Sequence, residues 1–280
     1  MIDLSRSTYY YNSKNKSDED LKFEADLLDR IDSIACECPR YGYRRITKQL
    51  HRDGFQVNHK KVLRLMRENS LLCSVKRKWI KTTDSRHLYR KYPNLIKDKS
   101  PNRPNQIWVS DITYIRINTG FVYLAVILDV YSRKVVGYAI SKSLNKDLVI
   151  HALESAITLR NPENGCIHHS DQGIQYACKE YVDILKTGGF KISMSSKGNP
   201  YENAYAESFF KTLKQEEVYL NNYQTFIDVA ERIPFFIEEV YNAKRLHSSL
   251  DYKPPDEFEA SYFNLHSFRK TSTLNYYLSV

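Results

Sequence analysis

Residues 17–38 carry apolar side chains at helical spacing. The apolar positions are Leu21, Ala25, Leu28, Ile31 and Ala35. Because residues three or four apart share one face of a helix, this spacing predicts an amphipathic helix that packs through that face. Ser17, followed by three acidic residues, is typical of a helix start, since a serine side chain caps free backbone N–H groups.

Two shorter helical patterns come next and are separated by a turn that contains Gly54. Ile46 and Leu50 share a face before the turn, and Asn58 after it is a good cap for a second helix. A helix, a glycine-containing turn and a second helix have the proportions of a helix-turn-helix, which we place at about residues 40–70. A helical hairpin that only packs against its neighbours is the alternative.

From residue 107 the pattern changes to short extended runs rich in β-branched and aromatic residues, which predict strands joined by tight turns. The predicted elements are, in order, strands at 108–117, 121–130 and 134–141, a helix at 146–160, a strand at 166–169, a helix at 175–189, a strand at 191–195 and a helix at 202–219. That order predicts an α/β fold of the ribonuclease-H-like kind. It is a mixed five-stranded sheet flanked by helices and preceded by an all-α helix-turn-helix region.

The charge pattern divides the chain. Residues 1–100 hold 23 basic and 13 acidic residues, whereas residues 101–280 hold 19 basic and 20 acidic residues. Between residues 40 and 100 the counts are 18 basic and 4 acidic, which is typical of a surface that binds a polyanion such as DNA. A basic face that is only solvated is the alternative. The predicted segments are a helical DNA-binding region at 1–75, a basic linker at 76–106, a ribonuclease-H-like core at 107–222 and a C-terminal helical extension at 223–280 that packs on the core.

The basic candidates for DNA contact lie on the two short helices and in the linker. They are Arg44, Arg45, Lys60, Lys61, Arg64, Arg67, Lys76, Arg77 and Lys78.

The five cysteines include no CxxC pair and no zinc-binding spacing with histidine, so we expect reduced thiols and no zinc. No run of 18 uncharged apolar residues occurs, which predicts a soluble protein of the cytoplasm without a membrane partner.

Three carboxylates stand in motifs on different predicted elements. Asp111 lies in SDITYI on the first strand, Asp171 in HSDQGIQY just beyond the fourth strand, and Glu207 in ENAYAESFF on the following helix. Strand ends and a helix that crosses them bring such positions together. Carboxylate oxygens suit Mg²⁺, and two ions about 3.5–4 Å apart stabilise the entering and leaving oxygens of a phosphodiester displacement. We therefore predict that these three residues are catalytic ligands of two Mg²⁺ ions, which Mn²⁺ can replace.

Other polar residues close to the carboxylates in sequence are candidates for supporting roles. Lys211 and Lys214 share a helical face with Glu207, which predicts contact with a DNA phosphate, although a surface charge ladder is the alternative. Lys197 and Asn203, in a polar segment before the helix, are predicted to meet DNA. His168 and His169 are predicted to orient Asp171 without binding the metal themselves.

Together these motifs resemble a known family of transposases. The matching stretches are WVSDIT, LDVYSRKVVGY, HSDQGIQY, SMSSKGNPYENAYAESFFKTLK and YNAKRLHSSLDYKPP, which extend from about residue 41 to residue 258. They are similar to the second-frame (OrfB) proteins of the insertion-sequence-three family, which have a retroviral-integrase-like DDE catalytic core. Four positions depart from the usual family pattern, and none is a predicted metal ligand: Ser110, Gln172, Glu202 and Pro234.

The resemblance implies an enzyme that nicks the ends of a transposon and transfers the cut strand to target DNA. It also implies a homo-oligomer on double-stranded DNA, a first-frame OrfA partner or a fusion with it, and a place at the bacterial nucleoid. Two alternatives remain from the sequence. One is a DNA-binding regulator without catalysis, and the other is a nuclease of the same fold that cuts but does not join.

Overall fold

The chain folds into two compact units, residues 1–75 and residues 76–280. The structure is a computed structural model that describes residues 17–73, 90–196 and 203–265. Of the predicted DNA contacts, Lys76, Arg77, Lys78 and Lys197 lie outside the described residues.

The described part of the N-terminal unit consists of α2 (Asp18–Glu37), α3 (Tyr43–Arg52) and α4 (His59–Glu68). Ser17 begins α2 as predicted, because its hydroxyl accepts the Asp20 N–H at 3.1 Å while the Asp20 carboxylate accepts the Ser17 N–H. The predicted apolar face of α2 was partly wrong. Leu27, Ile31 and Ile34 are buried, whereas Leu21 is 51% exposed. Leu21 lies at the start of α2, and the buried side chains begin at Leu27, so the packed face begins later along the helix.

The turn between α3 and α4 is stabilised by the two residues that were predicted for it, a glycine in the turn and a helix cap. Gly54 follows α3 with φ of +93°, a left-handed conformation that glycine adopts without steric cost. The side chain of Asn58 accepts the Lys60 N–H at 2.9 Å and caps α4. Ile46 and Leu50 of α3 and Val62, Leu65 and Met66 of α4 are buried, so both helices pack through their predicted faces.

The second unit is built on a five-stranded sheet with the order β3-β2-β1-β4-β5. The strands are β1 (Ile107–Ile117), β2 (Gly120–Asp129), β3 (Val135–Ser141), β4 (Ile167–Ser170) and β5 (Lys191–Met194). The first three strands form an antiparallel meander, and β4 and β5 continue the sheet in parallel from the other side of β1. This mixed sheet confirms the predicted ribonuclease-H-like topology.

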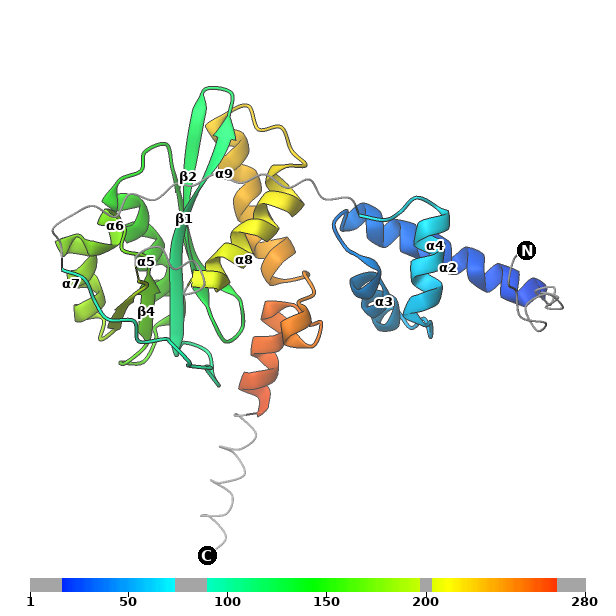
Figure 1. The fold of residues 1–280 in the computed structure, drawn as a ribbon, viewed down its shortest axis with the longest axis horizontal. Coiled ribbons are helices and arrows are strands. Elements are labelled where there is room, and N and C mark those ends of the chain that lie inside the picture. Colours follow the sequence, from blue (N-terminus) through cyan, green and yellow to red (C-terminus); the bar gives the residue numbers. More distant parts are fainter. Residues whose placement is uncertain (1–16, 74–89, 197–202, 266–280) are drawn as a thin grey trace, which may run out of the picture. The chain divides into compact units, whose positions relative to one another are not determined.

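Helices cover both faces of the sheet and enclose two hydrophobic cores (Figure 1). One face carries α5 (Lys146–Arg160), α6 (Ile174–Ala177) and α7 (Lys179–Thr187). The other face carries α8 (Ala204–Leu213), α9 (Phe226–Phe235) and the π-helical segment η3 (Phe236–Asn242). On β1, Val109 and Ile115 face α8, whereas Trp108 and Ile112 face α5 and α7, because side chains alternate along a strand.

A glycine allows α5 to approach the sheet closely. A Cβ atom added to Gly137 of β3 would stand 2.5 Å from the Ala152 carbonyl oxygen and 2.6 Å from the Ala156 Cβ of α5. Only a residue without a side chain fits between strand and helix at this point.

The C-terminal part of the unit shares the core of the sheet. Val229, Ile233 and Phe236 are buried in the same cluster as β1 and β2. Pro234 lies inside α9, which continues directly into η3. A proline removes one helical hydrogen bond, and a π turn changes the bonding pattern just beyond it. A short 3₁₀ turn, η4 (Ser248–Leu250), and a helix at 255–265 follow.

Candidate active site

Asp111 stands in the middle of the sheet and faces α8. It pairs with Val126 of β2 in the strand register, and its Oδ1 accepts the Ile112 N–H at 2.8 Å. Odd-numbered residues of β1 form the core beneath α8, so the alternation of the strand directs Asp111 toward that helix. The side chain is half-buried.

Asp171 directly follows β4, the parallel neighbour of β1. Its Oδ1 accepts the Gly173 N–H at 2.8 Å, and Gln172 Nε2 donates to the Ser195 carbonyl at 2.9 Å beyond the end of β5. A Cβ atom on Gly173 would lie 2.8 Å from Asp171 Oδ1, so a glycine leaves room for the carboxylate in this turn. The Asp171 side chain is thereby fixed at the edge where β1 and β4 run side by side.

Glu207 lies on the first half of α8 and is exposed. The start of this helix is joined to β1 next to Asp111, because Asn203 Nδ2 donates to the Ser110 carbonyl at 3.4 Å. Asn203 was predicted to meet DNA, and the structure places it in the protein interior with 6% of its side chain exposed. This contact was not predictable from the sequence pattern, because Asn203 and Ser110 are 93 residues apart.

The three carboxylates interact electrostatically. Burial, the negative charge of Asp171 and that of Glu207 raise the pKa of Asp111 to about 8, against the opposing effects of the Ile112 N–H and of Lys214. Burial also raises the pKa of Glu207. Among the described residues, no three acidic, histidine or cysteine side chains converge into a ready-made metal cluster. Burial is the largest cause of the raised pKa of Asp111, and repulsion by the two other carboxylates adds to it.

Lys214 is a basic residue whose positive charge acts on Asp111. It opens the π-helical segment η2 (Lys214–Val218), and its ammonium group lies 4.9 Å from the centre of the Tyr114 ring of β1. Burial lowers the pKa of Lys214, and Asp111 acts in the opposite direction. Lys211, one turn earlier, is exposed. The sequence pattern predicted one regular α-helix to residue 219, whereas the helix in the structure changes to π geometry at Lys214.

His168 and His169 are buried on β4. His168 Nε2 lies 3.0 Å from the Tyr181 hydroxyl of α7, and His169 Nδ1 lies 2.8 Å from Ser193 Oγ of β5. These bonds connect β4 to its neighbours on both sides. A supporting role toward Asp171 stays a prediction.

The basic side chains of the N-terminal unit differ in their surroundings. Arg64 forms ion pairs with Glu24 at 2.8 Å and Glu68 at 3.0 Å, and Lys61 lies 3.7 Å from Glu24. Lys60 and Arg67 are exposed on α4, and within the described residues no ion pair engages either one. On α3, Arg44 and Arg45 stack against Tyr43 and Tyr41. DNA contact by each of these basic residues stays a prediction.

One further contact beside the carboxylates was not anticipated. Ser110 Oγ donates to the Tyr176 hydroxyl at 3.0 Å, and both side chains are buried on the side of the sheet away from Asp111. The two residues are 66 positions apart, so only the pairing of β1 with α6 brings them together. This bond helps to fix the strand position next to Asp111.

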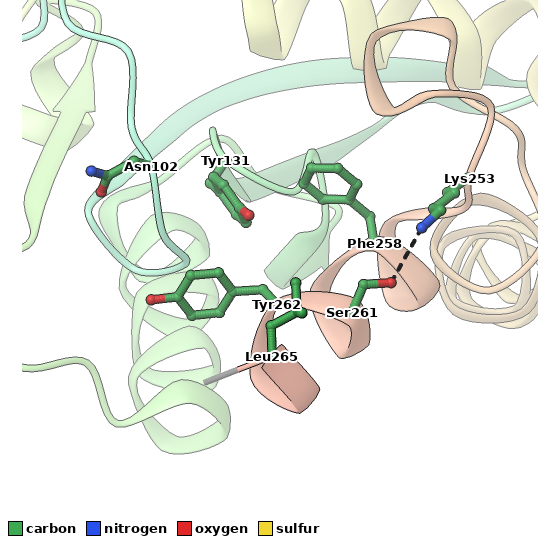
Figure 2. A pocket seen from close by; sticks show the side chains of 7 residues that line it. All are labelled: Asn102, Tyr131, Lys253, Phe258, Ser261, Tyr262 and Leu265. Atoms are coloured by element: carbon green, nitrogen blue, oxygen red, sulfur yellow. Dashed lines mark hydrogen bonds between the residues drawn. The ribbon is translucent and has the colours of Figure 1, made fainter. Parts of the chain in front are cut away.

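A pocket of about 500 Å³ lies elsewhere in the second unit, and none of the three carboxylates lines it (Figure 2). Its lining residues are Asn102, Tyr131, Lys253, Phe258, Ser261, Tyr262 and Leu265. Figure 2 shows Tyr131 facing the aromatic side chains of the helix at 255–265. The pocket therefore lies between the loop after β2 and the C-terminal helix.

Comparison with protein families assigns both units. Two families described as Integrase core domain match residues 101–200 and 188–255, and a family described as HTH-like domain matches residues 22–79. In the part of the chain that the structure describes, every helix is too short or too polar to span a bilayer.

Several relatives are similar over most of the chain. The transposase for insertion sequence element IS904 of Lactococcus lactis is 42% identical over 79% of this chain and 87% of its own length. The transposase for IS629 of Shigella sonnei is 33% identical over 94% of this chain and 90% of its own length. Transposase InsF for insertion sequence IS3A of Escherichia coli is 35% identical over 79% of this chain and 77% of its own length.

Among solved structures, the simian T-cell lymphotropic virus intasome is similar with a TM-score of 0.48 and 15% identity, over 82% of this chain and 74% of that chain. The HTLV-2 integrase catalytic core domain in complex with magnesium has a TM-score of 0.43 and 17% identity, over 56% of this chain and 98% of that chain.

Proposed function

This chain belongs to the insertion-sequence-three family of transposases, and from that premise we propose that Asp111, Asp171 and Glu207 are its catalytic carboxylates. The protein is a DDE transposase that acts in DNA transposition. The observation that carries the residue assignment is the charge coupling at Asp111, whose pKa is raised by both Asp171 and Glu207 although the three residues lie far apart in sequence. Carboxylates that raise the pKa of a neighbouring carboxylate favour a cation beside it, which supports a metal site at Asp111.

The donor set fits a hard divalent cation. Asp111, Asp171 and Glu207 offer only oxygen atoms, and magnesium typically takes one or two carboxylates, several waters and a substrate phosphate. We propose that the three residues hold two Mg²⁺ ions, for which Mn²⁺ can substitute. Bound there, the ions would activate the attacking hydroxyl and neutralise the leaving 3′ oxygen.

Backbone N–H groups and one lysine side chain are proposed to orient the carboxylates and the substrate. The Ile112 N–H donates to one oxygen of Asp111 and the Gly173 N–H to one oxygen of Asp171, so the backbone orients both carboxylates. Lys214 lies on the same side as Asp111 and carries the positive charge to hold a phosphate oxygen of the strand being cut. The nucleophile is water when the end is nicked and a DNA 3′-hydroxyl when the strand is joined.

The N-terminal unit is proposed to bind the DNA duplex. Its helix-turn-helix presents Lys60 and Arg67 on α4 and Arg44 on α3, which suit contact with phosphates or base edges. We also propose that residues 76–106 act as a basic linker, that residues 107–222 with the C-terminal extension 223–280 form the catalytic part, and that a homo-oligomer holds two ends. A first-frame OrfA protein, separate or fused, is the proposed partner for recognition of the ends.

The test is a strand-transfer assay with a pre-nicked transposon end in Mg²⁺ or Mn²⁺. We expect Asp171→Asn to bind the end DNA as well as the unchanged protein does, and to lose both nicking and joining by at least about a thousandfold, because metal-stabilised charge is lost at the reacting phosphate. Retained nicking by this variant would overturn the assignment of Asp171.

The same assay separates the two alternatives. A regulator would bind the end without any reaction, and a nuclease would release hydrolysed product without joined strands. Glu163→Gln is a suitable control, because Glu163 is exposed and pairs only with Arg103 among the described residues. It removes one carboxylate and should leave both steps unchanged.

A further inference from the structure

One half-buried arginine of the second unit carries a charge that no carboxylate neutralises. Four arginines of this unit are not fully exposed in the described ranges: Arg103, Arg133, Arg160 and Arg245. Three of them pair with a glutamate, Arg103 with Glu163 at 3.1 Å, Arg160 with Glu259 at 2.7 Å and Arg245 with Glu216 at 2.7 Å. Within the described residues Arg133 has no ion-pair partner.

An unpaired charge in this position is costly. Taking a guanidinium out of water is unfavourable unless an anion compensates for it, and burial lowers the pKa of Arg133 accordingly. The acids closest to Arg133 along the loop and helix have other partners. Asp129 accepts the backbone N–H groups of Asn105 and Tyr131, and Asp256 binds Lys134 at 2.7 Å.

The loop that carries Arg133 is held in a defined conformation. Arg133 has φ of +62°, a left-handed backbone that is uncommon for a residue with a side chain. The two preceding residues are both held in place. Ser132 Oγ donates to Glu259 at 2.8 Å. Tyr131 packs against Phe258 and Tyr262 with ring centres 5.2 and 5.6 Å apart, the aromatic group that Figure 2 shows. The direction of the Arg133 side chain is therefore set before any ligand arrives.

The guanidinium of Arg133 lies on an aromatic platform. Its central carbon is 4.1 Å from the centre of the Tyr205 ring, on the first turn of α8. Stacking covers one face of the planar guanidinium and leaves the N–H groups along its edge free to donate in the plane. That edge matches two oxygens of a phosphate, which an arginine binds through two parallel hydrogen bonds.

The position on α8 separates Arg133 from the carboxylates. Tyr205 and Glu207 are two residues apart and so point about 200° apart around the helix. Phe209, on the Tyr205 side of α8, contacts Tyr241 of η3, whereas Lys214 interacts with Asp111. Arg133 thus stacks on a residue of α8 that points away from Glu207.

We propose that Arg133, stacked on Tyr205, binds a backbone phosphate of duplex DNA on the flank of α8 opposite to Glu207. This inference rests on the proposed function, because the anion is identified as a DNA phosphate by the substrate of a transposase. Arg133 is a substrate-binding residue in this arrangement. Its contact fixes the path of the duplex across α8 and leaves the chemical step to the carboxylates.

The experiment is the salt dependence of DNA binding by the full chain. The probe is a fluorescent duplex that carries the transposon end, and binding is measured without divalent cations so that no reaction occurs. Each phosphate contact that is lost reduces the slope of log affinity against log salt by about 0.9. We expect Arg133→Gln to reduce the slope by about that amount and Arg103→Gln, the matched control with a carboxylate partner, to leave it unchanged.

Two further readouts complete the test. Arg133→Lys keeps the charge but loses the planar two-point contact, so we expect weaker binding at an unchanged slope. If Arg133→Gln does not fold, Arg133→Lys is the test. A DNA affinity of Arg133→Lys equal to that of the unchanged protein would then overturn the proposal. In strand transfer, Arg133→Gln should raise the DNA concentration at half-maximal rate and leave the rate at saturation unchanged.

The proposal is overturned if Arg133→Gln leaves the slope of log affinity against log salt unchanged. It is also overturned if Arg103→Gln decreases that slope by the same amount. An unchanged slope with loss of the oligomer in sedimentation would assign Arg133 to a carboxylate of a second subunit instead. Because binding is measured without metal, a failure of the unchanged protein to join DNA bears on the three carboxylates and not on Arg133.

Discussion

Asp111 and Asp129 are both half-buried or buried aspartates of the same antiparallel meander, yet their surroundings differ. Asp129 accepts N–H groups from Asn105, Tyr131 and Ser132, and burial raises its pKa to about 6. Asp111 accepts the Ile112 N–H and faces two further carboxylates. The first arrangement stabilises a loop, whereas the second brings negative charges close to one another.

His168 provides a test at the residue scale through its titration. Burial, with a smaller effect of His169, lowers the pKa of His168 to about 3. In the unfolded chain the imidazole takes up a proton below about pH 6.5, while the folded unit keeps it neutral down to about pH 3. The unfolded state binds more protons in this window, so the free energy of unfolding decreases with acidification by up to about 1.4 kcal/mol per pH unit.

The measurement is urea unfolding between about pH 7 and pH 5 for the unchanged protein and for His168→Gln. The variant is expected to be less stable at pH 7, because it loses a packed ring, and to show the shallower dependence on pH. His151→Gln is the control, since His151 is exposed on α5. Equal pH slopes for His168→Gln and the unchanged protein would contradict the assignment of a neutral buried imidazole.

At the scale of elements, the π-helical segment η2 determines where Lys214 lies. Two acidic residues of this segment bind arginines: Glu216 pairs with Arg245 through two contacts of 2.7 Å, and Glu217 pairs with Arg232 at 3.0 Å. The Arg245 and Glu216 side chains are 6% and 14% exposed, whereas Arg232 is 54% exposed. The Arg245 pair is therefore the stronger anchor of η2.

Replacement of each arginine by methionine compares the two anchors. Arg245→Met leaves the Glu216 charge buried without its partner, and we expect a loss of about 3 kcal/mol in the free energy of unfolding. Arg232→Met removes an exposed arginine, and Glu217 keeps its hydrogen bonds from Asn221 and Tyr223, so the loss should be about 1 kcal/mol or less. Chemical denaturation measures both, and similar losses for the two variants would show that burial does not distinguish them.

At the scale of the whole molecule, the helix at 255–265 is part of the sheet unit and not an appendage. Glu259 of this helix accepts two hydrogen bonds from Arg160 of α5, at 2.8 and 2.7 Å, and one from Ser132 in the loop after β2. The Glu259 and Arg160 side chains are 5% and 10% exposed. One carboxylate thus joins the helix at 255–265 to two segments that lie 99 and 127 residues earlier in the chain.

Glu259→Gln tests this connection. Loss of the charge leaves the buried Arg160 with Asp129 at 4.0 Å, so we expect about 2–4 kcal/mol of destabilisation. Hydrogen exchange should become faster in residues 130–134 and 255–265 together. Glu163→Gln, an exposed partner of Arg103, is the control and should change exchange little. Faster exchange in residues 255–265 alone would show that the helix is only loosely attached.

The sequence by itself determined the local elements and their order. Caps at Ser17 and Asn58, the glycine at 54 and the alternation along β1 depend on neighbours within a few residues, so the pattern predicts them correctly. The carboxylates were also evident, because each lies in a recognisable motif. The π geometry at Lys214 and the path of α9 through Pro234 were not, since both depend on packing against the core.

Only the tertiary structure decided which charged groups meet. Asp111 interacts with Asp171 and Glu207, Asn203 reaches Ser110, and Arg133 stands unpaired on Tyr205. Each of these relations joins residues at least 60 positions apart, and no periodicity in a sequence encodes such a distance. Strand pairing and helix packing set them, because the fold places one strand beside another and one helix across both.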